Sequence, residues 1–133
     1  MRAGLSRSSR RVLRPRVRDH RKLRAFELAD RLAVCTYERT RAFPKEEMFG
    51  LTAQLRRGAV SVPSNIVEGC ARQSQADYLR FLDIAYAACR ELEYQIGLSA
   101  RLGFLDESAR AELTALCVET GKVLAGLTRA LKA

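Results

Sequence analysis

Residues 51–66 carry apolar side chains at intervals of three and four, a spacing that places them on one side of an α-helix. This apolar side consists of Leu51, Leu55, Ala59, Val62 and Ile66. A second row, about 100° around the same helix, holds small and polar residues: Gln54, Gly58, Ser61, Asn65, Glu68 and Arg72. The apolar side predicts part of a helical core, and the polar side is the first candidate for a functional surface.

Three further segments repeat apolar residues with the same periodicity. Residues 23–42 contain no Gly or Pro and repeat Leu23, Phe26, Ala29, Ala33 and Tyr37, with Leu28 and Leu32 beside them. Residues 74–102 repeat Tyr78, Phe81, Leu82, Ala85, Ala88, Cys89, Leu92, Ile96 and Ser99, and residues 106–131 repeat Leu113, Leu116, Cys117, Thr120, Leu124, Leu127 and Leu131. Four such helices with short links predict an all-α fold, an up-and-down antiparallel four-helix bundle.

Helix start and stop signals separate these segments. They are Pro44, which suits the first turn of the second helix, Ser74, which begins a capping box with Asp77, Gly103, which stops the third helix, and Asp106 or Ser108, which caps the fourth. Pro63 lies inside the second helix and predicts a kink there.

Positive charge is concentrated at the start of the chain. The chain has 24 Lys/Arg and 15 Asp/Glu, of which residues 1–22 hold nine basic residues and one acidic residue. The rest, with 15 basic and 14 acidic residues, is nearly neutral. We therefore divide the chain into a basic tail, residues 1–22, and a bundle domain, residues 23–133, and expect the tail to be disordered up to about Asp19.

Two interpretations of the tail stay open. Its arginines, Arg10, Arg11 and Arg14 among them, suit an arm that neutralises phosphates. The alternative is that the tail is an upstream extension from an over-long gene model. The tail lacks the apolar core of a secretory signal, and no run of about 18 apolar residues predicts a membrane span.

The four cysteines, Cys35, Cys70, Cys89 and Cys117, form no CxxC motif, and the single histidine is His20. This spacing favours neither a zinc site nor a disulfide framework. We expect buried thiols in a cytoplasmic protein, with no metal and no cofactor.

Several apolar residues lie off the predicted core sides of the second and third helices. A bundle of this size covers only one side of each helix, so we expect these residues to form a homo-oligomer interface. They are Val60, Val67, Leu79, Tyr86, Tyr94 and Leu98.

A motif links several of these elements to a known family. It runs Phe43-Pro44-x-x-Glu47-x-x-Gly50-Leu51-x-x-Gln54-Leu55-Arg56-Arg57-x-Ala59-x-Ser61-Val62-Pro63-Ser64-Asn65-Ile66-x-Glu68-Gly69, followed by Arg72, Tyr78, Arg80-Phe81-Leu82, Ile84-Ala85, Glu91-Leu92-Glu93 and Gln95. From about Leu23 to Leu131 the chain resembles the four-helix-bundle family of 23S ribosomal RNA intervening-sequence proteins. The tail lies outside this resemblance.

The resemblance implies a bacterial protein that forms a pentameric ring. It also extends to accessory variability proteins of diversity-generating retroelements, pentamers that bind nucleic acid and a reverse transcriptase, which is a precedent and not a demonstrated role. The chain departs from the family pattern at two places: Gly58 replaces the usual Ala, and Ala87-Ala88 replace the usual Gly-Ser. The first lowers helix propensity, and the second removes a hydroxyl near Glu91.

The polar side of the second helix suits structure better than catalysis. Glu68 and Glu91 are the only carboxylates that we consider as a pair, and no His, Cys-His pair or metal motif accompanies them. We expect no enzymatic activity. Instead, we predict a polar network between helices or subunits, made of Gln54, Ser61, Asn65, Glu68 and Glu91.

Two function classes remain. In the first, a symmetric ring brings Arg56, Arg57 and Arg72 together with the tail arginines to bind RNA or DNA. In the second, the chain is a structural oligomer that docks a protein partner without binding nucleic acid. Neither involves a membrane.

Overall fold

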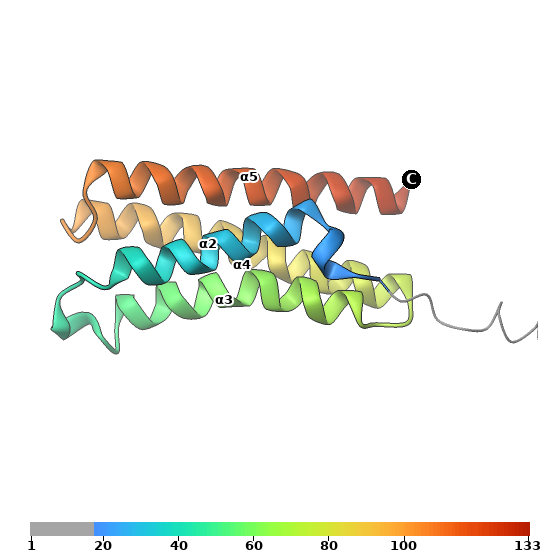
Figure 1. Cartoon of the computed structure of the whole chain (residues 1–133), viewed down its shortest axis with the longest axis horizontal. Coiled ribbons are helices and arrows are strands. Elements are labelled where there is room, and N and C mark those ends of the chain that lie inside the picture. The colour runs from blue at the N-terminus through green and yellow to red at the C-terminus, as the bar shows by residue number, and fades with distance from the viewer. Residues whose placement is uncertain (1–17) are drawn as a thin grey trace, which may run out of the picture.

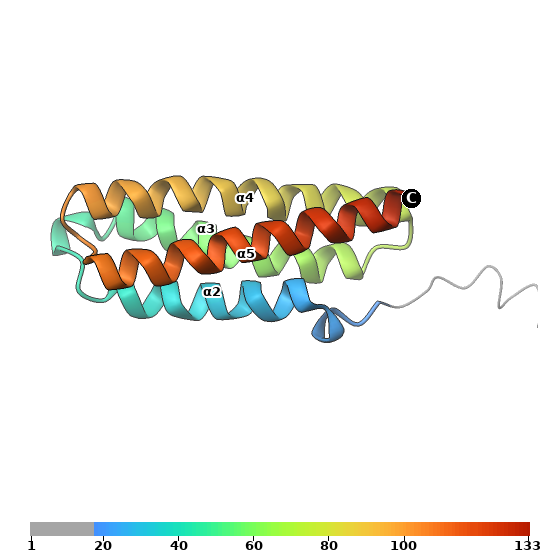
Figure 2. The ribbon, with the colours of Figure 1, turned by 90° about the horizontal axis from the view of Figure 1, so that it is seen from above.

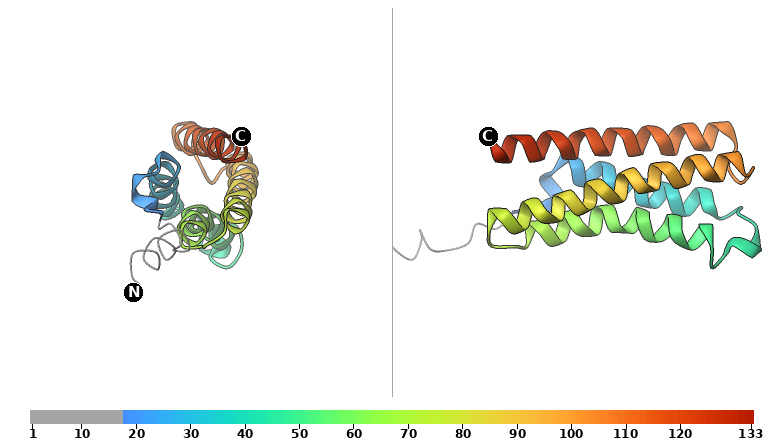
Figure 3. Two further views of the ribbon diagram at one scale, coloured as in Figure 1. Left: turned by 90° about the vertical axis from the view of Figure 1, so that its right-hand side faces the viewer. Right: turned by 180° about the vertical axis from the view of Figure 1, so that it is seen from behind.

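Four long α-helices lie side by side in a computed structural model that describes residues 18–133 (Figures 1 and 2). They are α2 (Arg24–Thr40), α3 (Leu51–Cys70), α4 (Gln75–Arg101) and α5 (Glu107–Lys132), and two short 3-10 helices, η1 (His20–Lys22) and η2 (Lys45–Glu47), precede α2 and α3. Each long helix runs antiparallel to the one before it and packs against two others: α2 against α3 and α5, and α4 against α3 and α5. Seen along its axis, the bundle has one helix at each of four corners (Figure 3). The predicted fold class is confirmed.

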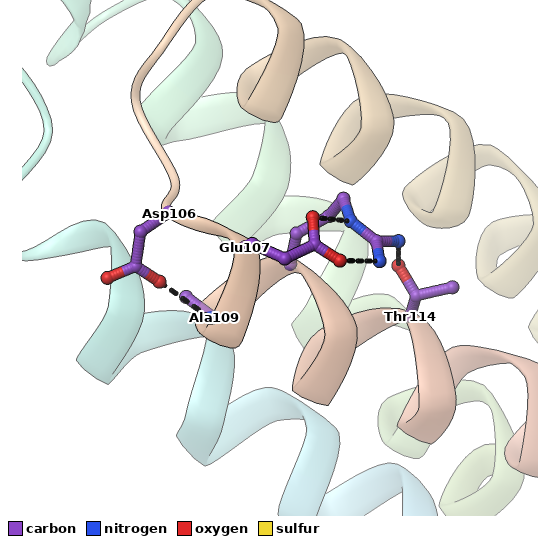
Figure 4. Close-up of polar contacts among 5 residues, drawn as sticks. Asp106, Glu107, Ala109 and Thr114 are labelled. Atoms are coloured by element: carbon purple, nitrogen blue, oxygen red, sulfur yellow. Dashed lines mark hydrogen bonds and ion pairs between the residues drawn. The ribbon is translucent and has the colours of Figure 1, made fainter.

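Capping residues set the ends of α4 and α5 as predicted. The Ser74 hydroxyl accepts a hydrogen bond of 3.1 Å from the backbone N–H of Asp77, and the Asp106 carboxylate accepts one of 2.8 Å from the N–H of Ala109. Figure 4 shows the Asp106 cap beside the ion pair between Glu107 and Arg110 in the first turn of α5. Gly103 follows α4 with φ +84°, a left-handed conformation that glycine adopts without strain. Asp106, and not Ser108, is thus the cap of α5.

The start of α3 differs from the prediction. The second helix was expected from Pro44, but η2 and a turn come first and α3 begins at Leu51. The cause is local: Gly50 has the non-helical angles φ −107° and ψ −114°, and the Glu47 carboxylate accepts a hydrogen bond of 3.0 Å from the N–H of Leu51. From there α3 runs through Pro63 to Cys70 without interruption.

The predicted core sides of α3, α4 and α5 point into the bundle, and all five apolar residues of the first row of α3 are buried. In α2 the prediction was wrong for Tyr37, which is 42% exposed. The buried side of α2 instead ends with Thr36 and Thr40, whose hydroxyls donate to the carbonyls of Leu32 and Thr36 at 2.7 and 2.8 Å. Threonines satisfied in this way are compatible with burial.

The folded part of the chain begins earlier than position 23. Asp19 caps η1, and the Arg18 guanidinium donates a hydrogen bond of 2.7 Å to the carbonyl of Arg72 and lies 4.2 Å from the ring centre of Tyr78. Residues 18–22, which we assigned to the tail, therefore pack on the bundle. The predictions for Arg10, Arg11 and Arg14 lie outside the described residues.

The helices of the described part, residues 18–133, include none with the length and apolar character needed to cross a membrane.

Candidate functional site

The polar row of α3 faces α4 across a groove of about 380 Å³, which we call the α3–α4 groove. Gly58 contributes no side chain to it, and the helix that forms the other wall contributes the small Ala88. The groove is lined by Gln54, Arg57, Gly58 and Ser61 from α3 and by Ala88, Glu91 and Gln95 from α4. Two of the positions that depart from the family pattern, Gly58 and Ala88, thus line the same groove, and at both of them a smaller side chain leaves it wider.

Gln95 joins the two walls of this groove. Its Nε2 donates to Oε1 of Gln54 at 3.4 Å, whereas its own Oε1 is buried with no hydrogen-bond partner among the described residues. A Cβ atom at Gly58 would lie 3.7 Å from that oxygen. The sequence motif contains Gln95, but the predicted polar network does not include it. Gln95 lies four residues after Glu91 and therefore on the same side of α4, which is the sequence feature that could have placed it in the network.

Asn65 contributes to a local contact within α3. Its Nδ2 donates to the carbonyl and the hydroxyl of Ser61, at 2.8 and 3.0 Å. Both partners lie one turn earlier in the same helix, so these bonds do not connect helices. The contact between helices in this polar set is the one between Gln54 and Gln95.

Glu68 and Glu91 are not brought together. Glu68 pairs with Arg72 at 2.6 Å and lines a second groove, of about 670 Å³, between the start of α2 and the end of α3. Phe26, Pro63, Val67 and Ala71 are the apolar residues of this α2–α3 groove. Glu91 lies in the α3–α4 groove, about 20 Å away along the bundle at 1.5 Å per residue. The two carboxylates therefore do not form an acid–base pair within one chain.

The three candidate arginines of the bundle have different surroundings. Arg56 donates from Nε to the Thr40 hydroxyl at 2.9 Å, and its guanidinium lies 4.7 Å from the ring centre of Tyr37. These contacts tie α3 to the end of α2, so Arg56 serves the fold. Arg57 is exposed at the edge of the α3–α4 groove.

Arg72 belongs to a cluster of guanidinium groups near the turn between α3 and α4. Arg72 and Arg80 lie 4.8 and 4.5 Å from the ring centre of Phe81, and Arg18 reaches the same region through the carbonyl of Arg72. Glu68 and Asp77 pair with Arg72 and Arg80 and offset part of this charge. Arg18, the first residue that the structure describes, lies at this end of the bundle.

The predicted interface residues divide into two groups. Val60, Val67 and Tyr94 are exposed, and Tyr94 reaches 62%. Tyr86 and Leu98 pack against the core, and Leu79 is half-buried. Tyr86 and Leu98 thus bury much of their apolar surface within the bundle and offer less of it to another subunit.

The cysteines have the character of structural thiols. Cys89 donates from its sulfur to the carbonyl of Cys117 at 3.1 Å, in the packed contact between α4 and α5. The hydrogen bond with Cys89, together with burial, raises the pKa of the Cys117 thiol, and burial raises the pKa of the Cys35 and Cys70 thiols. Within residues 18–133, no group of three or more His, Cys, Asp or Glu side chains is placed to hold a metal ion.

Known proteins resemble this chain in sequence family and in fold. The family model of the 23S rRNA-intervening sequence protein matches residues 21–126. The fold is similar to a crystal structure of a protein of unknown function from the S23 ribosomal protein family of Bacteroides thetaiotaomicron, with a TM-score of 0.72. That match has 23% sequence identity and covers 79% of this chain and 95% of the other, so it shows a shared fold. No curated protein gives a significant match.

Proposed function

This chain belongs to the 23S rRNA-intervening sequence protein family, and we propose on this premise that it is a non-enzymatic subunit of a homo-oligomeric ring, a pentamer, that acts as a nucleic-acid-associated accessory module. The proposal rests on one observation: α3 and α4 carry large apolar side chains that no other helix of the bundle covers. They are Val60 and Val67 on α3 and Ile84 and Tyr94 on α4.

A closed ring needs two different surfaces on each subunit. In a cyclic assembly each copy presents one surface to the copy before it and another to the copy after it, unless the assembly is a two-fold dimer. Apolar residues on both α3 and α4 supply two such surfaces, whereas an isolated subunit leaves them in water.

The absence of a catalytic role is supported by the placement of the two candidate carboxylates. Glu68 is paired with Arg72, and Glu91 lies in another groove. A hydrolytic mechanism needs a general acid and a general base near one substrate. Within one chain, these residues do not provide that arrangement.

Nucleic-acid association is supported by the charge of the tail sequence and by the arginines at the end of the bundle where Arg18 lies. Residues 1–17 carry six arginines and no acidic residue, and Arg18, Arg72 and Arg80 follow near that end of the bundle. A ring multiplies this charge by its number of subunits, which favours phosphate binding over reading of bases.

Two measurements test the proposal. Light scattering at micromolar concentration gives the mass of the assembly, and a monomer mass would refute the ring. Filter binding of RNA and DNA over a salt series tests the second part: affinity should fall steeply with salt, because each neutralised phosphate releases counterions.

The binding experiment needs a shortened chain that begins at Arg18 and keeps the contacts of Arg18 with the bundle. Loss of binding in this chain assigns the contact to the tail. If it still binds selectively in physiological salt, Arg57 and Arg72 are the first residues to replace. A ring that binds no nucleic acid at low salt would leave the other function class, a structural oligomer that docks a protein partner.

A further inference from the structure

Charged residues are distributed unequally between the two ends of the bundle. One end, which we call the basic end, holds the start of α2, the turn between α3 and α4 and the end of α5; the η2 end holds the opposite helix ends (Figure 1). Within about two turns of the basic end, residues 18–27, 64–81 and 126–133 carry eight Lys/Arg and four Asp/Glu. Residues 36–53 and 95–114, at the η2 end, carry five Lys/Arg and six Asp/Glu. The charge of the bundle therefore attracts an anionic partner to the basic end and not to the η2 end.

Three arginines of the basic end lie over two buried aromatic rings. The guanidinium of Arg18 lies 4.2 Å from the ring centre of Tyr78. The guanidinium groups of Arg72 and Arg80 lie 4.8 and 4.5 Å from the ring centre of Phe81. A guanidinium over an aromatic ring keeps N–H donors at its edge for other partners. The rings thus hold three positive groups close together, which lowers the entropy that these groups lose when they bind a ligand.

The carboxylates beside these arginines offset only part of the charge. Arg72 pairs with Glu68 at 2.6 Å, and Arg80 pairs with Asp77 at 3.5 Å. All four side chains are at least 40% exposed, and ion pairs at such positions are weak and screened by salt. Arg18 forms no ion pair within residues 18–133. A phosphate group can therefore join or replace the carboxylates as the partner of these arginines.

We propose that the phosphate groups of a nucleic acid bind at the basic end of the bundle, at Arg18, Arg72 and Arg80, and that the η2 end takes no part. This inference rests on the proposed nucleic-acid association and assigns it to one end of the folded domain. Guanidinium groups bind phosphate oxygens through charge-assisted hydrogen bonds, and such contacts do not read the base sequence. Six further arginines precede Arg18 in the sequence and are joined to the bundle through this residue.

Arg41 and Arg101 provide a comparison at the η2 end. Both are exposed, and within residues 18–133 neither forms an ion pair or lies over an aromatic ring. If the total charge alone decided the affinity, these two arginines would contribute as much as Arg72 and Arg80.

The first test compares two double variants of the full chain that lose the same charge. Arg72→Gln with Arg80→Gln changes the basic end, and Arg41→Gln with Arg101→Gln is the matched control. Both are measured by filter binding of a short single-stranded RNA and of the DNA of the same sequence, over a salt series. Circular dichroism and light scattering check that both keep the helix content and the mass of the wild type.

The basic-end variant should bind about tenfold more weakly than the wild type at low salt. The slope of log affinity against log salt should fall by roughly 1 for each phosphate contact that is lost. RNA and DNA should respond alike, because the contacts are with phosphate. The control variant should stay within about twofold of the wild type, since its arginines lie away from the bound phosphates.

The second test locates the nucleic acid without removing a charge. Gln73→Cys places a thiol in the turn between α3 and α4, and Ser108→Cys places one at the η2 end, both at exposed positions. Each variant is labelled with a thiol-reactive photo-cross-linker and irradiated with the same RNA, with the wild type as the control for its own cysteines. We expect RNA cross-linked to Gln73→Cys above the wild-type level, and no such excess with Ser108→Cys.

The outcomes separate this inference from the function on which it rests. If the full-length wild type binds neither RNA nor DNA at low salt, the nucleic-acid association and this inference are both overturned. If it binds, but both double variants weaken binding equally, or Ser108→Cys cross-links as much RNA as Gln73→Cys, the assignment to the basic end is overturned and the association remains. If the basic-end variant loses helix content, the cross-linking comparison decides.

Discussion

Gly69 on α3 lies so close to Phe81 on α4 that a Cβ atom at position 69 would be 3.0 Å from the Cβ of Phe81. The same atom would lie 3.2 Å from the ring of Tyr78. These distances are shorter than ordinary van der Waals contacts, and the Cβ of Phe81 is attached to the backbone and has little freedom to move. The glycine at the end of α3 therefore permits the close approach of α3 and α4 beside their connecting turn.

Gly69→Ala should destabilise the chain by about 1–3 kcal/mol, the usual cost of overpacking a core. The added methyl group forces α3 and α4 apart, and this outweighs the gain in helix propensity of up to about 1 kcal/mol. Urea unfolding measures the change in the free energy of unfolding. An unchanged or higher stability would show that the two helices can separate at this point at no cost.

Gly58→Ala should have the opposite sign and stabilise the chain by up to about 1 kcal/mol. A Cβ atom there would meet Oε1 of Gln95 at 3.7 Å and Cδ1 of Leu92 at 3.8 Å, which are ordinary contacts. The gain comes from the lower conformational entropy of the unfolded chain and from helix propensity. Measured beside Gly69→Ala, it tests whether space or propensity decides at each glycine.

The sequence predicts where the helices lie, but it does not predict how closely they pack at positions such as these two glycines. Periodicity located the four helices, because apolar spacing reports directly which side of each helix is buried. It was wrong at Tyr37, since two apolar rows in residues 23–42 compete and only packing decides between them. The register of α3 against α4, in which Gly69 meets Phe81 and Gly58 meets Leu92, depends on how the two helices pack in three dimensions and has no local signal.

The candidate site shows the same limit. The polar row of α3 was predicted, and three of its residues, Gln54, Gly58 and Ser61, line the α3–α4 groove. Spacing along α3 did not reveal that Asn65 bonds within its own helix, or that Arg56 contacts α2 whereas Arg57 does not. Those differences depend on which neighbouring helix each side of α3 meets.

Arg56→Ala should lower the free energy of unfolding by about 1–2 kcal/mol, because it removes a hydrogen bond from a charged group and a cation–π contact. The contacts are those with the Thr40 hydroxyl and the Tyr37 ring. Arg57→Ala, the neighbouring control, should change stability by no more than about 0.5 kcal/mol. Equal effects of the two substitutions in urea unfolding would contradict the structural role of Arg56.

Tyr78 should make the chain less stable at alkaline pH. Burial raises the pKa of Tyr78 from 10 to about 12. In the folded state the phenol stays neutral to higher pH than in the unfolded state, so its contribution is complete below pH 10 and is lost as the pH rises from 10 to 12. At pH 11 the loss is about 1.4 kcal/mol relative to pH 9.

Tyr78→Phe tests this origin, because the variant has no phenol to ionise. The difference in the free energy of unfolding between pH 9 and pH 11 should be about 1.4 kcal/mol smaller in this variant than in the wild type. A pH dependence that persists in Tyr78→Phe would assign the alkaline loss to other groups.

Arg18 should stabilise the bundle although it lies before the first long helix. It donates a hydrogen bond of 2.7 Å to the carbonyl of Arg72 and lies over the Tyr78 ring. A chain that begins at Lys22 should therefore be about 1–2 kcal/mol less stable than one that begins at Arg18. Arg18→Ala in the full chain should lower the free energy of unfolding by a similar amount. Urea unfolding of the two shortened chains and of Arg18→Ala, each compared with the wild type, measures these changes.

If the chains beginning at Arg18 and at Lys22 are equally stable, the contacts of Arg18 contribute nothing to stability. Either chain would then serve to test whether the tail binds nucleic acid. If they differ as expected, a loss of RNA binding in the chain that begins at Lys22 combines lost charge with lost stability, and only the chain that begins at Arg18 isolates the charge of residues 1–17.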